Sequence, residues 1–190
     1  MWIMKQTVVI TGASRGIGRA VALAFAEKSA SKNNHEEYNI FVNCAKTSEL
    51  LENVKKQIRN LGVCCESFTG DISNYNTAME MFDEVHRHFG NVDILVNNAG
   101  ISIIGLFQDM TRDEWDRIMN VNVGSVYNCC HFAIPDMINA KSGRIINISS
   151  VYGQVGVIGA ANYAASKSGL EGLTKSLARE VGRLGITVNM

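Results

Sequence analysis

"VITGASRGIG", residues 9–18, places Gly12, Gly16 and Gly18 between a β-branched run and a stretch of helical composition. This order predicts a strand, a tight turn and a helix. Glycines at such a junction let a ligand approach bare backbone, and the first amides of a helix are unpaired donors that favour a phosphate. The stretch therefore predicts a nucleotide site. The alternative is that the glycines only permit a tight turn and close helix packing.

Apolar runs alternate with helix-like stretches on both sides of this turn. Strands are expected at residues 7–11, 40–45, 63–71, 92–100, 143–150 and 186–190, and helices at 19–28, 47–62, 76–90, 111–140 and 161–185. The stretch 111–140 is expected to be interrupted only by Pro135, because proline removes a helix hydrogen bond. Strands too apolar to face water on either side predict an α/β fold with a doubly wound, Rossmann-like parallel sheet between two helix layers.

Four small or polar stretches follow the expected strands, namely "TGASRGIG", "GDIS", "NNAG" and "SSVYG". In a parallel α/β sheet, ligands bind at the carboxyl ends of the strands. The four stretches are therefore expected to meet in one crevice, which favours the nucleotide interpretation of the glycines over the purely structural one.

Length and composition indicate one domain that handles a small molecule. The 190 residues are expected to form a single domain, and 18 basic residues balance 18 acidic ones, which argues against nucleic acid or an anionic membrane as partner. No apolar run approaches the ~20 residues of a membrane span, and the first strand starts too early for a signal peptide, so we expect a cytoplasmic protein. The five cysteines lack C-x-x-C spacing and are expected to be reduced core thiols, and no metal site is predicted.

Tyr163 and Lys167 stand four residues apart on an expected helix, so both side chains lie on one face. A phenol is a poor acid near neutral pH unless a nearby ammonium stabilises its phenolate. The pair could therefore serve general acid/base catalysis. The same spacing also occurs on solvated helix faces that have no function.

The motifs occur together in one order, which is more specific than any one of them. With "TGASRGIG", "NNAG", a serine thirteen residues before Tyr163, and "YAASK", the chain resembles the short-chain dehydrogenase/reductase family from about residue 7 to 189. "GRIINISS" and "GITVN" are most similar to its 3-oxoacyl-[acyl-carrier-protein] reductases of fatty acid synthesis. The resemblance implies NADPH-dependent reduction of a carrier-bound 3-oxoacyl thioester by a homotetramer. The alternatives are a general carbonyl or hydroxysteroid reductase and a non-catalytic nucleotide-binding fragment.

The resemblance also implies a cofactor site. Gly12, Ser14, Arg15, Gly16, Ile17 and Gly18 would hold the adenosine and pyrophosphate, Asp71 and Ile72 would meet the adenine, and Asn98, Ala99 and Gly100 would line the ribose side. NADPH is favoured over NADH because the window "VNCAKTSE" has no acid before Glu49, while Arg15 and Lys46 supply positive charge for a 2′-phosphate. The alternative is that both cations are merely solvated.

Catalytic roles follow from the same resemblance. Ser150 would hydrogen-bond the substrate carbonyl, and Tyr163 would protonate its oxygen. Lys167 would hold the nicotinamide ribose and assist Tyr163, and Asn122 would anchor a water for proton resupply. The open alternatives are Ser149 in place of Ser150 and Asn120 in place of Asn122.

The end of the chain departs from the family pattern. Members normally continue past the position of Met190 with a substrate-covering segment, a further helix and a seventh strand. We therefore expect that this chain either is a fragment of a longer polypeptide or differs from the family in the part that selects substrate.

Overall fold

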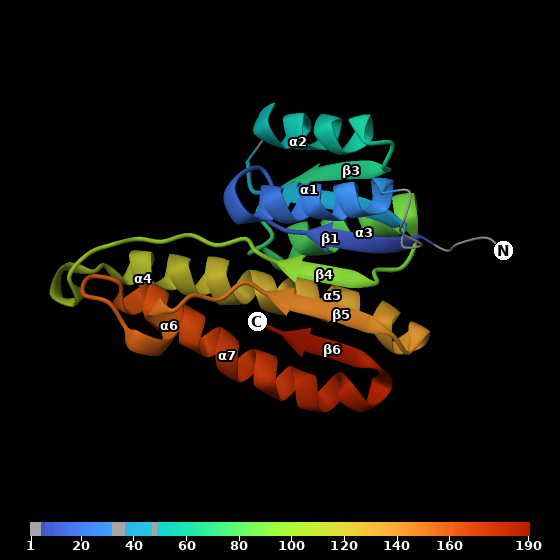
Figure 1. Cartoon of the computed structure of the whole chain (residues 1–190). Helices are drawn as coiled ribbons and strands as arrows, with labels where there is room; N and C mark the ends of the chain where they lie inside the picture. Colours follow the sequence, from blue (N-terminus) through green and yellow to red (C-terminus); the bar gives the residue numbers. More distant parts are fainter. Residues whose placement is uncertain (1–4, 32–36, 47–48) are drawn as a thin grey trace.

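The computed structural model describes residues 5–31, 37–46 and 49–190 and shows one parallel sheet (Figure 1). The described strands are β1 (Gln6–Ile10), β2 (Tyr38–Cys44), β3 (Cys65–Thr69), β4 (Ile94–Asn97), β5 (Gly143–Asn147) and β6 (Ile186–Asn189). Their order is β3-β2-β1-β4-β5-β6, and every neighbouring pair is parallel. The strand order reverses direction between β1 and β4, which confirms the doubly wound, Rossmann-like sheet.

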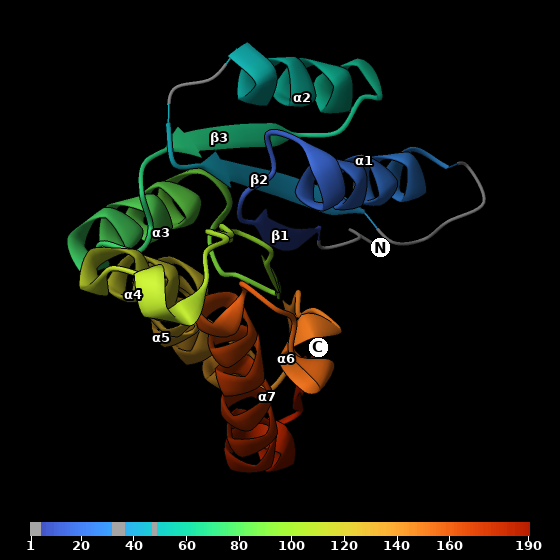
Figure 2. The same ribbon diagram turned by 90° about the vertical axis from the view of Figure 1, so that its left-hand side faces the viewer.

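Helices cover both faces of the sheet. They are α1 (Gly16–Ala30), α2 (Glu49–Asn60), α3 (Tyr75–Phe89), α4 (Arg112–Met119), α5 (Ser125–Ala140), α6 (Tyr152–Val155) and α7 (Ala161–Val181). Strand β1 alternates, with Val8 and Ile10 in the core under α1 and α2 and Val9 in the core under α3, α5 and α7. Figure 2 shows α1 and α2 on one side of the sheet and the other large helices opposite. Because the side chains of a strand alternate, one buried sheet supports two hydrophobic cores.

The element boundaries agree with the sequence in most places. The helix expected from residue 47 is observed over Glu49–Asn60, and residues 47 and 48 lie outside the described part of the chain. The last expected helix ends at Val181 and continues as a 3-10 turn, Gly182–Leu184. Helix α6 was not expected from the sequence.

The predicted interruption at Pro135 is wrong. Helix α5 runs through Pro135 to Ala140, whereas the irregular segment is a π-helical turn, η2 (Asn120–Gly124), between α4 and α5. Pro135 is exposed, and its neighbours Ala133 and Met137 are fully buried in the core. We infer that this packing on the buried face compensates for the one hydrogen bond that a proline removes.

The cysteine expectation holds with one exception. Cys44, Cys65, Cys129 and Cys130 are buried free thiols, but Cys64 is exposed. Consecutive residues of an extended chain point in opposite directions, so Cys64 and Cys65 cannot share one environment. Burial raises the pKa of Cys65 and of Cys130 to about 12, which keeps these thiols protonated.

No helix in the described part of the chain is long and apolar enough to cross a membrane.

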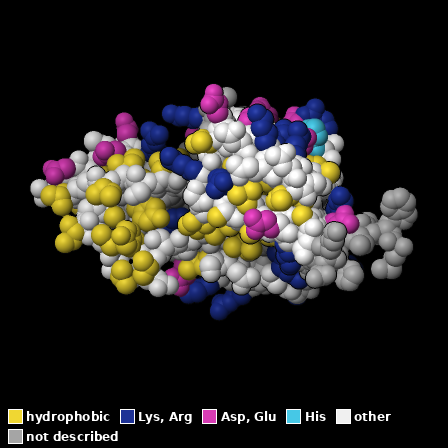
Figure 3. Space-filling model, turned by 45° about the horizontal axis from the view of Figure 1, so that its top comes forward, with side chains coloured by type: hydrophobic (Ala, Val, Ile, Leu, Met, Phe, Trp, Pro, Cys, Tyr) yellow, Lys and Arg dark blue, Asp and Glu magenta, His cyan; other side chains and the backbone are white. Residues whose placement is uncertain are grey.

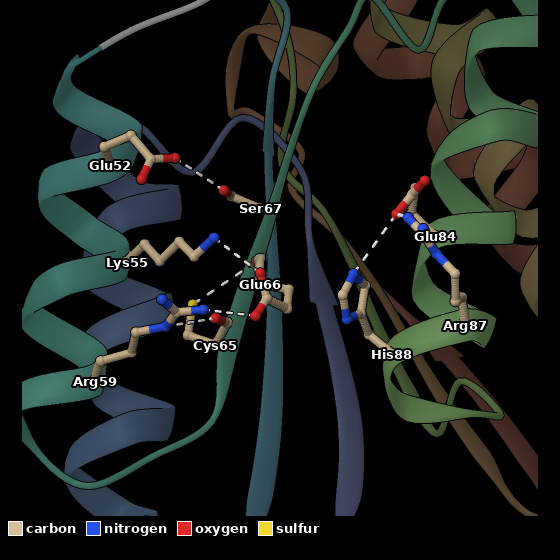
Figure 4. Close-up of polar contacts among 9 residues, drawn as sticks. All are labelled: Glu52, Lys55, Arg59, Cys65, Glu66, Ser67, Glu84, Arg87 and His88. Carbon is tan, nitrogen blue, oxygen red and sulfur yellow. Dashed lines mark hydrogen bonds and ion pairs between the residues drawn. The ribbon is translucent and has the colours of Figure 1, made fainter.

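Helix α2 covers the free edge of β3 with charged side chains (Figure 4). Arg59 donates from Nε to the carbonyl oxygen of Cys65 at 3.0 Å, which occupies an edge acceptor that another strand could otherwise use. Glu66 accepts from Lys55 at 2.8 Å and from Arg59 at 2.5 Å. Partial burial alone would raise the pKa of Glu66, but the hydrogen bond and charge of Lys55, with the charge of Arg59, hold that pKa below its ordinary value.

Replacing Glu66→Gln should lower the free energy of unfolding at pH 7 by about 0.5–1 kcal/mol, because both partners are partly exposed. A lowered folded-state pKa gives stability that is present above the unfolded-state pKa of about 4.3 and lost as pH falls through the folded value. In denaturant titrations, the difference in the free energy of unfolding between Glu66→Gln and wild type should therefore shrink toward about pH 3.

Glu84→Gln is the matched control, because the ion pairs of Glu84 are with Arg87 and His88 of its own helix, α3 (Figure 4). Its substitution should change stability by less than about 0.5 kcal/mol. A Glu66→Gln effect of equal size at both pH values would contradict the ion-pair account.

Candidate functional site

The turn after β1 is held against the end of β4. The Thr11 hydroxyl accepts from the backbone amides of Asn98 and Ala99, each at 3.0 Å. Asn98 Nδ2 in turn donates to the carbonyl oxygens of Thr11 at 2.9 Å and Gly12 at 3.1 Å. A Cβ at Gly18 would lie 2.4 Å from Asn98 Nδ2, and Gly12 has φ of +65°. Glycine is therefore required here by close approach as well as by backbone conformation.

Helix α1 begins at this turn with open amides. Its N-cap residue, Arg15, is extended and makes no side-chain capping bond, and the first turn contains no acidic residue. An uncapped helix N-terminus presents unpaired N–H donors and partial positive charge. This end of α1 is chemically suited to an anionic group such as a pyrophosphate.

A cavity of about 340 Å³ opens at the carboxyl ends of the strands. The predicted cofactor residues that line it are Gly12, Ser14, Arg15, Ile17, Asp71, Ile72, Asn98, Ala99 and Gly100. Five predicted cofactor residues do not line it: Gly16, Gly18, Lys46, Tyr163 and Lys167. Gly18 packs behind the turn, and Lys46 is exposed.

Sequence reasoning missed part of the cavity lining. Asn43, Cys44 and Ala45 at the end of β2 line it, as do Ile101, Val121 and Ser125. Asn43 could have been predicted from the sequence, because it is a polar residue inside the apolar run "IFVNCA". None of these described residues at the end of β2 is acidic, so the cavity offers no carboxylate to a ribose there.

Lys167 lies close to Gly100, which lines the cavity. A Cβ at Gly100 would lie 3.8 Å from Lys167 Nζ. This ammonium donates to the carbonyl oxygen of Ile148 at 2.7 Å and lies 5.7 Å from the centre of the Tyr163 ring. Burial lowers the pKa of Lys167, since the charged form loses hydration. Tyr163 and Lys167 thus share one face of α7, as the spacing predicts.

Asn122 is fully buried in the π-helical turn, whereas Asn120 is exposed. Asn122 Oδ1 accepts from the Ile101 amide at 2.8 Å, and Nδ2 donates to the Ile101 carbonyl and to Ser166 Oγ, each at 3.0 Å. The Ser166 hydroxyl then donates to the carbonyl of Tyr163 at 2.7 Å. Both N–H donors of Asn122 are used, so a water at this residue would have to donate to one of its oxygens.

Ser150 follows β5 and precedes α6. Its hydroxyl accepts from the amide of Tyr152 at 3.2 Å, and the Tyr152 ring meets the Tyr163 ring edge-on with centroids 6.3 Å apart. Ser149 is half-buried, like Ser150. Among the described residues, no contact distinguishes Ser150 from Ser149 as the serine that would bind a substrate carbonyl, so the choice of Ser150 stays a prediction.

A group of exposed apolar side chains lies on two adjoining segments, the second of which leads into α7. They come from the segment after β4 and from the segment around α6, which are joined by a hydrogen bond from the Gly105 amide to the Gly159 carbonyl at 2.9 Å. The most exposed are Ile104 at 79%, Phe107 at 72% and Ile158 at 89%. Figure 3 shows hydrophobic side chains gathered at the left-hand end of the molecule, where these segments lie in Figure 1. We call this group of exposed apolar side chains the apolar rim.

Sequence similarity relates this chain to a known protein family and to several named relatives. A family model described as short chain dehydrogenase matches residues 6–190. The chain is 44% identical over 186 residues to the 3-oxoacyl-[acyl-carrier-protein] reductase FabG of Staphylococcus aureus, covering 98% of this chain and 72% of that relative. Identity to the FabG of Staphylococcus epidermidis is 42% over 98% of this chain and 73% of the relative. The FabG of Pseudomonas aeruginosa is 37% identical over 189 residues, which cover 100% of this chain and 73% of that relative. The chain is thus shorter than these relatives.

Replacing Gly18→Ala should destabilise the fold by about 1–3 kcal/mol, because the added methyl would overlap Asn98 Nδ2 and the Gly12 carbonyl. Thermal unfolding measures the loss. Gly172→Ala is the control, since Gly172 lies in α7 with no atom near its added Cβ. That variant should gain up to about 1 kcal/mol from helix propensity. Unchanged stability in Gly18→Ala would refute the close-packing account.

Proposed function

The chain belongs to the short chain dehydrogenase family, and on this premise we propose that it reduces a 3-oxoacyl thioester carried on acyl carrier protein to the 3-hydroxyacyl thioester, with NADPH as reductant. The observation that carries the proposal is that Lys167, with the Tyr163 ring centre 5.7 Å from its Nζ, lies beside Gly100, and that Gly100 lines the same cavity as Arg15 at the open N-terminus of α1. The same cavity thus adjoins the open N-terminus of α1, which suits an anion, and the proposed acid/base pair. The three relatives compared above are named as reductases of this kind.

The residues present fit a dinucleotide phosphate. The α1 amides would hold the pyrophosphate, and Gly12, which lines the cavity, would leave room for it. Arg15 lines the cavity, and no acidic residue lines it at the end of β2, which supports binding of a 2′-phosphate over a free 2′-hydroxyl. When bound there, NADPH supplies a hydride to the substrate carbonyl carbon.

Residues of the chain itself would carry out the proton transfer. The Tyr163 hydroxyl would donate it to the developing alkoxide, and the Ser150 hydroxyl would donate a hydrogen bond to the same oxygen. The Lys167 ammonium would stabilise the resulting tyrosinate, and its burial, which lowers its pKa, makes it a better proton donor. Asn122 would hold the adjoining backbone at Ile101 in place.

The apolar rim supports an acyl substrate. Exposed side chains such as Ile104, Phe107 and Ile158 offer hydrophobic contact beside the proposed reaction site.

The alternative functions are those of a general carbonyl reductase or a hydroxysteroid reductase with the same acid/base pair. Turnover on acyl-carrier thioesters compared with free ketones separates them, and a preference for free ketones would favour these alternatives.

Homo-oligomers, with a tetramer expected, are also part of the proposal. A hollow of about 310 Å³ lies between α5 and α7, lined by apolar side chains that include Tyr127, Ile134, Leu173 and Leu177. An apolar hollow on a helix pair suits contact with another copy of the chain.

Replacing Tyr163→Phe should lower kcat by at least about 100-fold, because the ring is kept while the proton donor is lost. NADPH affinity should stay within about threefold in a direct binding titration, since the hydroxyl serves proton transfer. Tyr75→Phe, at the start of α3, is the control and should retain kcat. Near-normal turnover in Tyr163→Phe would remove Tyr163 from its proposed role.

Replacing Arg15→Ala should weaken NADPH binding by about tenfold or more and NADH binding by less than about twofold, because only NADPH offers a 2′-phosphate to a guanidinium. Arg19→Ala is the matched control, since Arg19 lies one turn further along α1 and bonds Gln57 at 2.9 Å. Equal loss for both cofactors in Arg15→Ala would show that Arg15 does not bind that phosphate.

A further inference from the structure

The loop between β3 and α3, residues 70–73, supplies Asp71 and Ile72 to the cavity. It belongs to neither element, so its shape depends on turn and side-chain contacts. Within the loop, Asp71 Oδ1 accepts from the amide of Ser73 at 3.0 Å and from its hydroxyl at 2.8 Å. The carbonyl oxygens of Gly70, Ile72 and Ser73 accept hydrogen bonds from side chains outside the loop.

Asn43 of β2 binds one end of the loop. Its Nδ2 donates to the carbonyl oxygens of Gly70 at 3.1 Å and Phe68 at 3.3 Å. Its own carbonyl accepts from the amide of Ala13 in the glycine turn at 2.8 Å, and the Gly70 amide donates to the next carbonyl, that of Cys44, at 2.9 Å. Asn43 thus connects the glycine turn directly to the loop.

Asn128 of α5 binds the other end. Its Nδ2 donates to the carbonyl oxygens of Ile72 at 2.9 Å and Ser73 at 3.2 Å. Residues 128 and 72 are 56 positions apart in sequence, and Asn128 is nearly buried in α5. The contact therefore comes from a different layer of the fold than the contact made by Asn43.

The chemistry of both amides points to the loop. A carboxamide buried without partners costs about 1–3 kcal/mol, so its presence in an apolar strand or helix requires compensating bonds. Asn128 directs Nδ2 to two carbonyl oxygens of the loop region and Asn43 directs Nδ2 to two others, with a further contact at 3.4 Å to the neighbouring Cys44 carbonyl, and these bonds also fix the orientation of each amide. Between them they hold four carbonyls in and next to residues 70–73.

We propose that Asn43 and Asn128 are positioning residues that fix residues 70–73, and with them Asp71 and Ile72, in the shape that binds the adenosine half of the dinucleotide. The inference rests on the proposed cofactor function and adds to it the residues that set affinity at one end of the site. Loss of either amide frees the loop but leaves Tyr163 and Lys167 in place.

The test is titration calorimetry of the Asn128→Ala variant with adenosine 2′,5′-bisphosphate, which carries only the adenosine end, and with NADPH. Binding of both should weaken about tenfold, as expected for the loss of two buried hydrogen bonds. The kcat at saturating NADPH should stay within about twofold, while the KM for NADPH rises. A general structural role would instead lower kcat and thermal stability with no selective loss of the adenosine ligand, and that result would overturn the inference.

Matched variants complete the design. Asn139→Ala changes an exposed asparagine near the end of the same helix and should leave both affinities unchanged. Asn128→Gln keeps the donor amide and should recover part of the affinity. If Asn128→Ala does not fold, Asn128→Leu keeps the side-chain volume without the donor amide and provides the same readout. Asn43→Ala, with Asn39→Ala on the same strand as its control, is compared for ligand affinity only, because Asn43 also lines the cavity.

The outcomes separate this inference from the proposed function. A wild-type protein that binds neither adenosine 2′,5′-bisphosphate nor NADPH overturns both. A wild type that binds them, with variants at positions 43 and 128 that bind equally well, overturns only the positioning role.

Discussion

The contact between the glycine turn and the end of β4 is the constraint on which the site depends. Asn98 reaches back to the carbonyls of Thr11 and Gly12, and the Thr11 hydroxyl receives two amides from the β4 end. These bonds join two strands at the point where the sheet order reverses direction. A crevice opens at such a point because the connections from the two strands leave in opposite directions. The cavity, the open α1 terminus and the approach to Lys167 all follow from it.

Neutral amides recur around this crevice. Asn43, Asn98, Asn122 and Asn128 each use the side-chain nitrogen to hold backbone carbonyls from another part of the chain. A carboxamide provides two donors and an acceptor, so one side chain can satisfy several groups of an irregular loop. It does so without the desolvation cost of a buried charge. The loops at the strand ends are thereby fixed although they lack regular secondary structure.

The two ends of the site differ in physical character. The cavity at the strand ends is lined by residues such as Gly12 and Asn98, whereas the segments after β4 and around α6 carry exposed apolar side chains such as Phe107 and Ile158. Lys167 is nearly buried and donates to the Ile148 carbonyl. Under the proposed function, this division separates a rigid cofactor site from a surface that contacts the acyl group.

The sequence by itself determined the order of strands and helices, the glycine turn, and the placement of Tyr163 and Lys167 on one helix face. These features depend on local periodicity and spacing, which short stretches of chain encode. Only the tertiary structure decided that α5 continues through Pro135, that the irregular turn lies at Asn120–Gly124, and that Asn122 is buried while Asn120 is exposed. It also decided that Asn43 and Asn128 bind the same loop. The physical reason is that these outcomes depend on packing and hydrogen bonds between segments far apart in the chain, such as Asn128 with Ile72 across 56 positions.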